Sequence, residues 1–327
     1  MPSLFSNASA ATLPVMNTEP AIAVTLAVAT RTLDRVIAAV VLTFAAPPGM
    51  LEDCLESIVA AGGARVYAVD NGTMAAARLD ARAGLIDCEL ITTGHNRGFA
   101  GGMNVGIERA LADGAETVVV LNDDVVVDPG WLDPLIAELA GDPSVGAVQP
   151  KLLVAGSDPP MVNSLGVLLG ADGAGRDIGH GQPDTGRDEP VTIALFTGGA
   201  VAFRSAFLRD VGLFDERFFL YYEDVDLGLR GAERGWTYRC APASRVHHRG
   251  SATASRRPDR VAYLRERNRL WILVRHRPLA DAGRGFWLSI RRLRHPPRTV
   301  HLRALIAGAA AIPRLTIARV RARHISG

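Results

Sequence analysis

The chain has 327 residues, of which 48% are hydrophobic and 21% are charged, and its formal net charge is +2. A chain of this length and apolar content can bury a full core, which argues against general disorder, and its near-neutral charge argues against binding of nucleic acid through overall charge. The cysteines Cys54, Cys88 and Cys240 are scattered and lack a C-x-x-C spacing, so the sequence indicates neither a disulfide framework nor a zinc site and fits a reducing cytosol.

Residues 1–34 are expected to form a tail or an added edge element. Their apolar run AIAVTLAVAT lies between Glu19 and Arg31 and has about half of the roughly 20 residues that a membrane-spanning helix needs. No basic residue precedes the run, so it does not resemble a secretory signal peptide.

Apolar segments of strand length alternate with amphipathic segments from residue 36 onward. VIAAVVLTF (36–44) is uninterrupted and rich in β-branched residues, which is typical of a strand buried on both faces of a parallel sheet. Apolar residues from Leu51 to Val59 recur at i, i+3, i+4, i+7 and i+8 and predict a helix. Further strands are expected at 65–70, 88–93 and 117–122, with helical segments around 74–83 and 103–112. The alternation predicts a doubly wound, mostly parallel α/β sheet.

The second half of the chain continues with less regular spacing. A helix is expected at 131–140, and the Gly- and Asp-rich stretch 156–189 reads as a long loop region with one hairpin. The stretch 191–212 predicts a strand, a Gly-Gly turn and a helix, and RCAPASRV (239–246) predicts another strand.

Polar side chains follow three of the expected strands. Asp70 and Asn71 follow the second strand, the stretch 95–97 follows the third, and Asp123 and Asp124 come directly after the apolar run TVVVL. Because ligands bind beyond the carboxyl ends of the strands in open parallel sheets, these segments predict one cleft. A turn or helix cap before Pro129 is the alternative explanation for the two adjacent aspartates.

NRGFAGGMNVG (96–106) carries glycines at 98, 101, 102 and 106. Glycines ahead of a helix allow a phosphate or a sugar to approach backbone N–H groups, where the helix dipole favours negative charge. A tight turn would explain one or two of these glycines. A dinucleotide-binding fingerprint would have to follow the first strand with G-x-G-x-x-G spacing, and this sequence meets neither condition.

LYYEDVDLGLR (220–230) places Glu223, Asp224 and Asp226 within four positions. Neighbouring carboxylates raise one another's pKa, and a carboxylate with a raised pKa is a better proton acceptor at neutral pH. The alternative is a helix N-terminus stabilised by acidic residues, which suits Asp226 best.

Two further features could contact a sugar ring. Thr197, Gly198 and Gly199 form a turn without large side chains, on which a sugar ring could lie, although small residues serve packing equally well. Trp236 could stack on a sugar ring, whereas a tryptophan in the core is the more usual finding.

The motifs, taken together, resemble family 2 glycosyltransferases of the GT-A fold, and within them the rhamnosyltransferase-like branch. The resemblance covers about residues 36–275 and rests on the following segments in order: VVLTF, VDNG, HNRGFAGGMNVG, LNDDVVVDPGWL, FTGGAVAFRSAFLRDVGLFDERFFLYYEDVDLGLR and RVHHRGSAT. It implies a Rossmann-like, mostly parallel sheet flanked by helices, with 35–130 for the nucleotide sugar and 131–275 for the acceptor and catalysis. The residues themselves predict 1–34 as the tail and 276–327 as a basic helical extension at the C-terminus.

The resemblance implies an inverting, metal-dependent transferase that moves L-rhamnose from dTDP-rhamnose to a lipid-linked or cell-envelope saccharide, for example a polyprenyl-diphosphate-linked acceptor. A UDP-hexose or galactofuranose donor is the alternative within the class. A non-catalytic sugar-nucleotide or membrane-binding module is the alternative from another class, because Asn122 stands at the first position of the family's D-x-D motif.

Roles of single residues follow from the same resemblance. Asp124 is expected to ligate Mg²⁺ or Mn²⁺, hard cations that prefer oxygen ligands, and the spacing favours His248 over His247 as a further ligand. Asp224 is expected to be the base, with Glu223 orienting or binding the acceptor, and Arg267 could contact phosphate. The acceptor is expected at Gly198, Gly199 and Trp236. The nucleotide sugar is expected at Thr43, Asp70, Asn71, Asn96, Arg97, Gly98, Gly101, Gly102, Asn104 and Asp123.

The segment 284–323 interleaves arginines with large apolar residues and is broken by Pro296, Pro297 and Pro313. A cationic, amphipathic segment of this kind could lie on an anionic membrane surface; a nucleic-acid patch or a protein-docking helix are the alternatives. Its most apolar part, ALIAGAAAIP, is too short to span a bilayer. The expected location is cytoplasmic, at the inner face of the plasma membrane, without a nucleic-acid partner.

Overall fold

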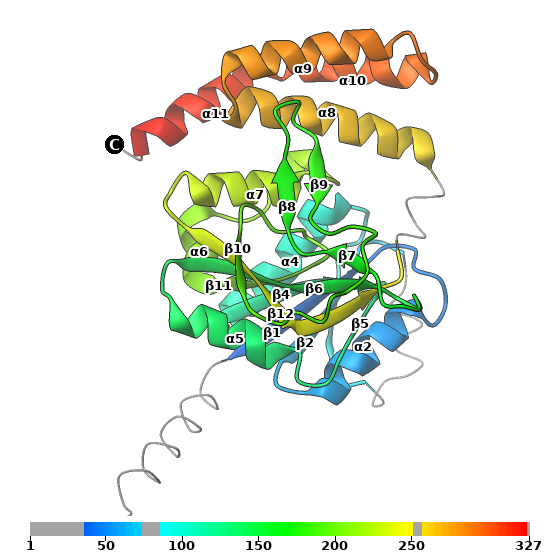
Figure 1. The fold of residues 1–327 in the computed structure, drawn as a ribbon, viewed down its shortest axis with the longest axis vertical. Coiled ribbons are helices and arrows are strands. Elements are labelled where there is room, and N and C mark those ends of the chain that lie inside the picture. Colours follow the sequence, from blue (N-terminus) through cyan, green and yellow to red (C-terminus); the bar gives the residue numbers. More distant parts are fainter. Residues whose placement is uncertain (1–35, 74–85, 251–256, 326–327) are drawn as a thin grey trace, which may run out of the picture. The chain divides into compact units, whose positions relative to one another are not determined.

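A ten-stranded sheet organises the protein (Figure 1). The structure is a computed structural model that describes residues 36–73, 86–250 and 257–325. The expected helix around 74–83 and the expected tail 1–34 therefore lie outside the described residues.

The first half of the sheet is parallel, as the alternation of strands and helices predicts. Its strands lie in the order β3 (Glu89–Thr92), β2 (Arg65–Asp70), β1 (Ile37–Thr43) and β4 (Thr117–Asn122). In-register pairs such as Val41 with Ala68 and with Leu121 align their carboxyl ends. Asp70, Asn71 and Asp123 therefore follow strands that end at the same edge.

The second half of the sheet is mixed. β11 (Ala200–Arg204) is antiparallel to both β4 and β6 (Val145–Val154), and β6 is parallel to β12 (Thr237–His248). The remaining strands are short: β10 (Val191–Ile193) and β5 (Val125–Val127) pair with β12, and β7 (Val162–Ser164) pairs with β6. The long loop region contains the expected hairpin as a separate pair, β8 (Val167–Leu169) and β9 (Gly175–Asp177).

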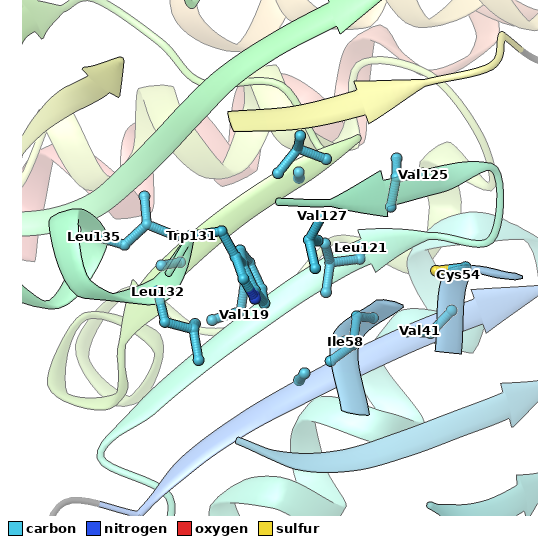
Figure 2. Packing of buried hydrophobic residues seen from close by; sticks show 14 of the residues in the cluster. Val41, Cys54, Ile58, Val119, Leu121, Val125, Val127, Trp131, Leu132 and Leu135 are labelled. Atoms are coloured by element: carbon cyan, nitrogen blue, oxygen red, sulfur yellow. The ribbon is translucent and has the colours of Figure 1, made fainter. Parts of the chain in front are cut away.

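Helices cover both faces of the sheet because successive residues of each strand point to opposite sides. On β1, Ala39 and Val41 pack in one core cluster and Ala38 and Val40 in another. The first cluster is closed by α2 (Met50–Ala61) and α5 (Leu132–Gly141), and Figure 2 shows Trp131 among the valines and leucines of this side. The second cluster is closed by α4 (Gly98–Ala112), α6 (Ser205–Val211) and α7 (Glu223–Ala232).

The C-terminal part of the chain is helical and packs as a layer of its own (Figure 1). It comprises α8 (Pro258–His276), α9 (Leu279–Arg292), α10 (Arg298–Ala310) and α11 (Ile312–Ile325). Trp271 of α8 meets Phe218, at the end of the short 3₁₀ helix η1 (Glu216–Phe218), edge to face with ring centroids 5.5 Å apart. Helices α9 to α11 pack on α8, and the expected division at residue 276 stays a prediction.

Within the described ranges, no single helix is both long and apolar enough to cross a membrane. Only α10 and residues 312–320 of α11, taken together as a pair bent by 45°, meet the criteria of length and composition.

Glycines on α4 allow this helix to lie close against the sheet. A Cβ atom on Gly106 would stand 2.3 Å from Val40 Cγ1 and 2.8 Å from Val69 Cγ2. Both valines belong to buried strands, so the helix itself would have to move away.

We therefore expect Gly106→Ala to lower the free energy of unfolding by about 1–3 kcal/mol, the usual range for overpacking a core. Gly141→Ala is the matched control, because a Cβ at this exposed end of α5 meets no heavy atom within 4 Å. Chemical denaturation of both variants measures the difference, and equal stability of the two would contradict this account of the α4 packing.

Candidate active site

A cavity of about 880 Å³ opens where β1 and β4 end. Its walls also include the β8–β9 hairpin, the loop before α7 and the start of α8. Segments that are far apart along the chain therefore meet here, as the parallel topology predicts. Of the residues singled out in the sequence, those that line the cavity are Asn71, Asn96, Gly98, Asn122, Asp123, Asp124, Thr197, Gly198, Gly199, Glu223, Asp224 and His248.

Six of the ten residues expected at the nucleotide do not line the cavity, and Thr43, Asp70 and Arg97 are three of them. Thr43 is fully buried at the end of β1. Asp70 accepts hydrogen bonds from the backbone and the hydroxyl of Thr73 at 2.9 and 2.8 Å, and Arg97 forms an ion pair with Glu216 at 3.1 Å. These three residues therefore stabilise the segments around the cavity. Their contact with a nucleotide stays a prediction.

The glycines of the NRGFAGG stretch serve close packing, which differs from the expected open approach of a phosphate. Gly98 has φ +75°, and a Cβ there would stand 2.2 Å from the carbonyl oxygen of Phe219. A Cβ on Gly102 would meet Leu42 at 2.6 Å, and one on Gly101 would meet Arg97 at 2.9 Å. The space near these glycines is therefore filled by the protein itself, and only Gly98 still borders the cavity.

Asn104 and Trp236 are also held away from the cavity. The Asn104 amide donates to the carbonyl of Phe214 at 2.9 Å and accepts from its N–H at 3.1 Å. The Trp236 indole donates to Asp210 at 2.8 Å and packs edge to face on Phe207. Both side chains stabilise the fold, because their polar atoms are occupied by distant backbone or side-chain partners.

Asp124 and His248 face each other across 3.2 Å, from Asp124 Oδ1 to His248 Nε2. Both atoms are buried, and neither has a hydrogen bond of acceptable geometry among the described residues. His248 Nδ1 lies 3.1 Å from Asn163 Oδ1. An amide oxygen accepts, so Nδ1 donates to Asn163 and the ring is oriented with Nε2 directed at Asp124.

This pair fits a divalent cation. A carboxylate oxygen and an imidazole nitrogen that face each other across 3.2 Å are two donor atoms that one cation could bind together. A histidine ligand whose second nitrogen donates to an amide or carboxylate oxygen is the common arrangement at metal sites. No group of three or more His, Cys, Asp or Glu side chains suited to a metal occurs in the described ranges, so further ligands would have to come from a substrate or from water.

His247 and Asp123, which are adjacent in sequence to this pair, have different surroundings. His247 Nε2 lies 3.0 Å from Asp128 Oδ1, and His247 does not line the cavity. Burial raises the pKa of Asp123 to about 6, with the charge of Asp124 adding to the effect. The geometry therefore favours Asp124 and His248 as the ligand pair.

Glu223 and Asp224 begin α7 at the other side of the cavity. Asp224 accepts hydrogen bonds from the N–H groups of Gly198 at 2.8 Å and Val225 at 2.7 Å. Burial raises the pKa of Asp224 in spite of these donors. Burial, followed by the charge of Asp224, raises the pKa of Glu223 well above its ordinary value. A half-buried carboxylate with a raised pKa, fixed by two backbone donors, is suited to accept a proton.

The third acidic residue of this cluster, Asp226, points away from the cavity. It binds Arg230 at 2.8 Å, Arg275 at 2.8 Å and His276 at 2.9 Å. These ion pairs lower its pKa although it is fully buried. Asp226 thus ties α7 to α8.

The loop that leads into α7 has an unusual backbone. Phe219, Tyr221 and Tyr222 all have φ near +68° to +69°, a left-handed conformation that costs a non-glycine residue about 1–3 kcal/mol. The fully buried side-chain amide of Asn268 on α8 donates to the carbonyls of Phe218, Leu220 and Tyr221 at 3.0, 2.9 and 2.7 Å. One side chain therefore holds the strained loop that positions Glu223 and Asp224.

The neighbour of Asn268, Arg267, does not line the cavity either. It donates to the Phe218 carbonyl at 2.7 Å, and its guanidinium lies 4.3 Å from the centre of the Trp271 ring. The position expected to contact phosphate thus supports the same loop as Asn268.

Sequence reasoning did not identify Asn163 or Asn268 as site residues. A buried asparagine within the helix 258–276 is a detectable signal, because asparagine is a poor helix former and needs a reason to be there. Asn163 lies in the Gly- and Asp-rich stretch and carries no such signal.

Comparison with known proteins agrees with this geometry. Residues 34–272 match the family model described as glycosyltransferase like family 2. A pre-mycofactocin glycosyltransferase of Mycobacterium tuberculosis is 32% identical over 256 residues, covering 76% of this chain and 46% of that protein. An N-acetylglucosaminyl-diphospho-decaprenol L-rhamnosyltransferase of the same organism is 29% identical over 218 residues, covering 61% of this chain and 68% of that protein.

Among solved structures, GalNAc-T7, crystallised with UDP, GalNAc and Mn²⁺, superposes with a TM-score of 0.61 at 14% identity, covering 83% of this chain and 53% of that one. At this identity the likeness concerns the fold alone. The chain spans about half the length of the pre-mycofactocin glycosyltransferase. The family match extends over most of the described sheet and the whole cavity wall up to α8. The chain belongs to the glycosyltransferase-like family 2 and has the GT-A fold.

Proposed function

We propose that the protein is a metal-dependent, inverting glycosyltransferase that moves a sugar from a nucleoside-diphosphate donor to an acceptor hydroxyl. One observation carries the proposal: the facing pair Asp124 and His248 and the carboxylate Asp224 line the same cavity. The pair is suited to bind a cation that holds a diphosphate, and Asp224 is suited to accept a proton.

Asp124 and His248 would hold the cation, with Asn163 fixing the histidine tautomer. Mg²⁺ or Mn²⁺ bound there would neutralise the negative charge that develops on the departing nucleoside diphosphate. Asn96 lines the same side of the site and would offer its amide N–H groups to the nucleotide sugar, whereas the buried Asn71 amide bonds Gly98 and Arg97 and would position that loop.

Asp224 would remove the proton from the acceptor hydroxyl, which then attacks the anomeric carbon as the bond to the diphosphate breaks. Attack on the face opposite the leaving group inverts the anomeric configuration. The Gly198 N–H holds Asp224 in place, and Glu223 beside it would bind the acceptor. An intact, held base argues against the alternative of a non-catalytic sugar-nucleotide module.

For the donor we propose dTDP-rhamnose, and for the acceptor a lipid-linked or cell-envelope saccharide. The support is the similarity to a protein named as an L-rhamnosyltransferase. A UDP-hexose or galactofuranose donor is the alternative, and a thermal-shift screen of nucleotide sugars with Mn²⁺ distinguishes them.

We also place the protein at the inner face of the plasma membrane. Trp287 and Ile290 on α9 and Ile306 on α10 are 54%, 53% and 60% exposed. Exposed apolar side chains on helices that also carry arginines suit the boundary of an anionic bilayer.

The metal pair gives the first test of this function. We expect Asp124→Ala and His248→Ala to weaken Mn²⁺-dependent binding of the nucleoside diphosphate at least tenfold, because each loses a ligand. His247→Ala is the matched control, since His247 faces Asp128, and it should bind normally. Calorimetric titration with and without Mn²⁺ makes the comparison. Unchanged binding by both variants would rule out this metal site.

The base gives the second test. Asp224→Asn should keep donor binding and lower kcat by about 10²–10⁴-fold, the usual contribution of a general base. In the unmodified enzyme the base must be ionised, so kcat/KM should fall as the pH drops through the raised pKa of Asp224. A variant with near-normal turnover would exclude Asp224 as the base.

The hydrogen bonds from Asn268 to the loop before α7 give the third test. Asn268→Asp has nearly the same size but places a carboxylate oxygen against three carbonyls, so the loop should relax and misplace Asp224. We expect kcat to fall at least tenfold while nucleotide affinity changes less than twofold, a split that general unfolding would not produce. Normal kcat in this variant and in Asn268→Ala would show that the amide does not position the base.

A further inference from the structure

The first half of α8 turns one amphipathic face toward the cavity. Arg257, Arg260, Val261, Leu264 and Arg265 all line the cavity. Arg260, Val261, Leu264 and Arg265 lie on a single face of α8, and Arg257 is the residue that directly precedes the helix. With Arg257, this face combines three cations with two aliphatic side chains, and the functions proposed above do not use it.

Two of these arginines are oriented by aromatic rings. The guanidinium of Arg260 lies 4.7 Å from the centre of the Phe219 ring, and that of Arg265 lies 4.5 Å from the centre of the Tyr221 ring. Stacking of this kind fixes the plane of a guanidinium and leaves its charge and its outer N–H donors available.

The positive charge of this face is not neutralised within the described ranges. Arg257, Arg260 and Arg265 form no ion pair with a described carboxylate, whereas Arg269 and Arg275, further along the same helix, are paired with Glu266 and Asp226. Guanidinium groups that border a cavity without a carboxylate partner are suited to bind an external anion, and phosphate matches their fork of donors best.

The position of the face in the cavity indicates which substrate would carry the anion. Phe219 and Tyr221, which orient the arginines, belong to the loop that leads directly into Glu223 and Asp224. The metal pair comes instead from the ends of β4 and β12. The donor diphosphate is accounted for at the metal pair, so the arginines remain for an anion on the acceptor.

We propose that this face of α8 binds the phosphate or diphosphate of a lipid-linked acceptor, with Val261 and Leu264 against the first part of its hydrocarbon chain. The proposal rests on the proposed function and names the acceptor class. Arg260 and Arg265 hold the anionic group, and the sugar beyond it reaches Asp224.

Farnesyl diphosphate is a water-soluble probe for this site. We expect it to bind the full-length protein in EDTA, where a metal at Asp124 plays no part, and farnesol to bind much more weakly. Arg260→Gln/Arg265→Gln should weaken farnesyl diphosphate binding about tenfold or more, because each lost contact is a charge-assisted hydrogen bond. Titration calorimetry measures both.

Two controls keep the result interpretable. Arg284→Gln on α9 removes an exposed arginine that does not line the cavity and should leave farnesyl diphosphate binding unchanged. The double variant should bind nucleoside diphosphate with Mn²⁺ as the unmodified protein does, which also shows that it is folded.

Three outcomes would overturn the proposal: no binding of farnesyl diphosphate by the unmodified protein, equal binding by the double variant, or loss of nucleotide binding with farnesyl diphosphate binding retained. The last outcome would assign the arginines to the donor. Failure of the proposed function would appear separately, as absence of Mn²⁺-dependent nucleotide binding in the unmodified protein.

Discussion

The geometry of the site depends on the bond between one buried amide and the loop before α7. Asn268 holds three carbonyls of residues whose neighbours adopt left-handed backbone conformations. Without such a partner, buried carbonyls in a strained loop would be unsatisfied and the loop would relax. The loop sets the start of α7 and with it the carboxylate of Asp224. Because Asn268 belongs to α8, this C-terminal helix positions part of the site, as the sheet does.

Charge is divided within the cavity. Most of its carboxylates and His248 come from the strand ends and α7, the start of α8 contributes only arginines as charged groups, and β9 adds both Arg176 and Asp177. A substrate pair with a diphosphate on the donor and a hydroxyl on the acceptor needs opposite environments for the two chemical events, one that stabilises negative charge and one that accepts a proton. In the proposed function, the metal pair at the strand ends would stabilise the negative charge, and Asp224 at the start of α7 would accept the proton.

Much of the sheet could be predicted from the sequence, because β1, β2 and β4 are uninterrupted apolar runs and their parallel pairing fixes where Asp70, Asn71, Asp123 and Asp124 emerge. The roles of the glycines and of Asn104 could not. Gly98 is adjacent to Phe219, and Asn104 bonds Phe214 at a separation of 110 residues. The sequence gives the chemistry that a side chain can perform, but the partner that decides its role comes from a distant part of the chain and is known only from the fold. For the same reason Trp236, expected to stack on a sugar ring, and Arg267, expected to contact phosphate, instead contact other parts of the protein.

The carbonyl of Phe219 makes two contacts with the start of α4. It accepts from the N–H of Ala100 at 3.4 Å and occupies the place that a side chain on residue 98 would need. The segment that carries the proton acceptor and the segment that begins α4 are thus in direct mechanical contact. A shift of either segment would press on the other, so the loop before α7 and the start of α4 constrain each other's position.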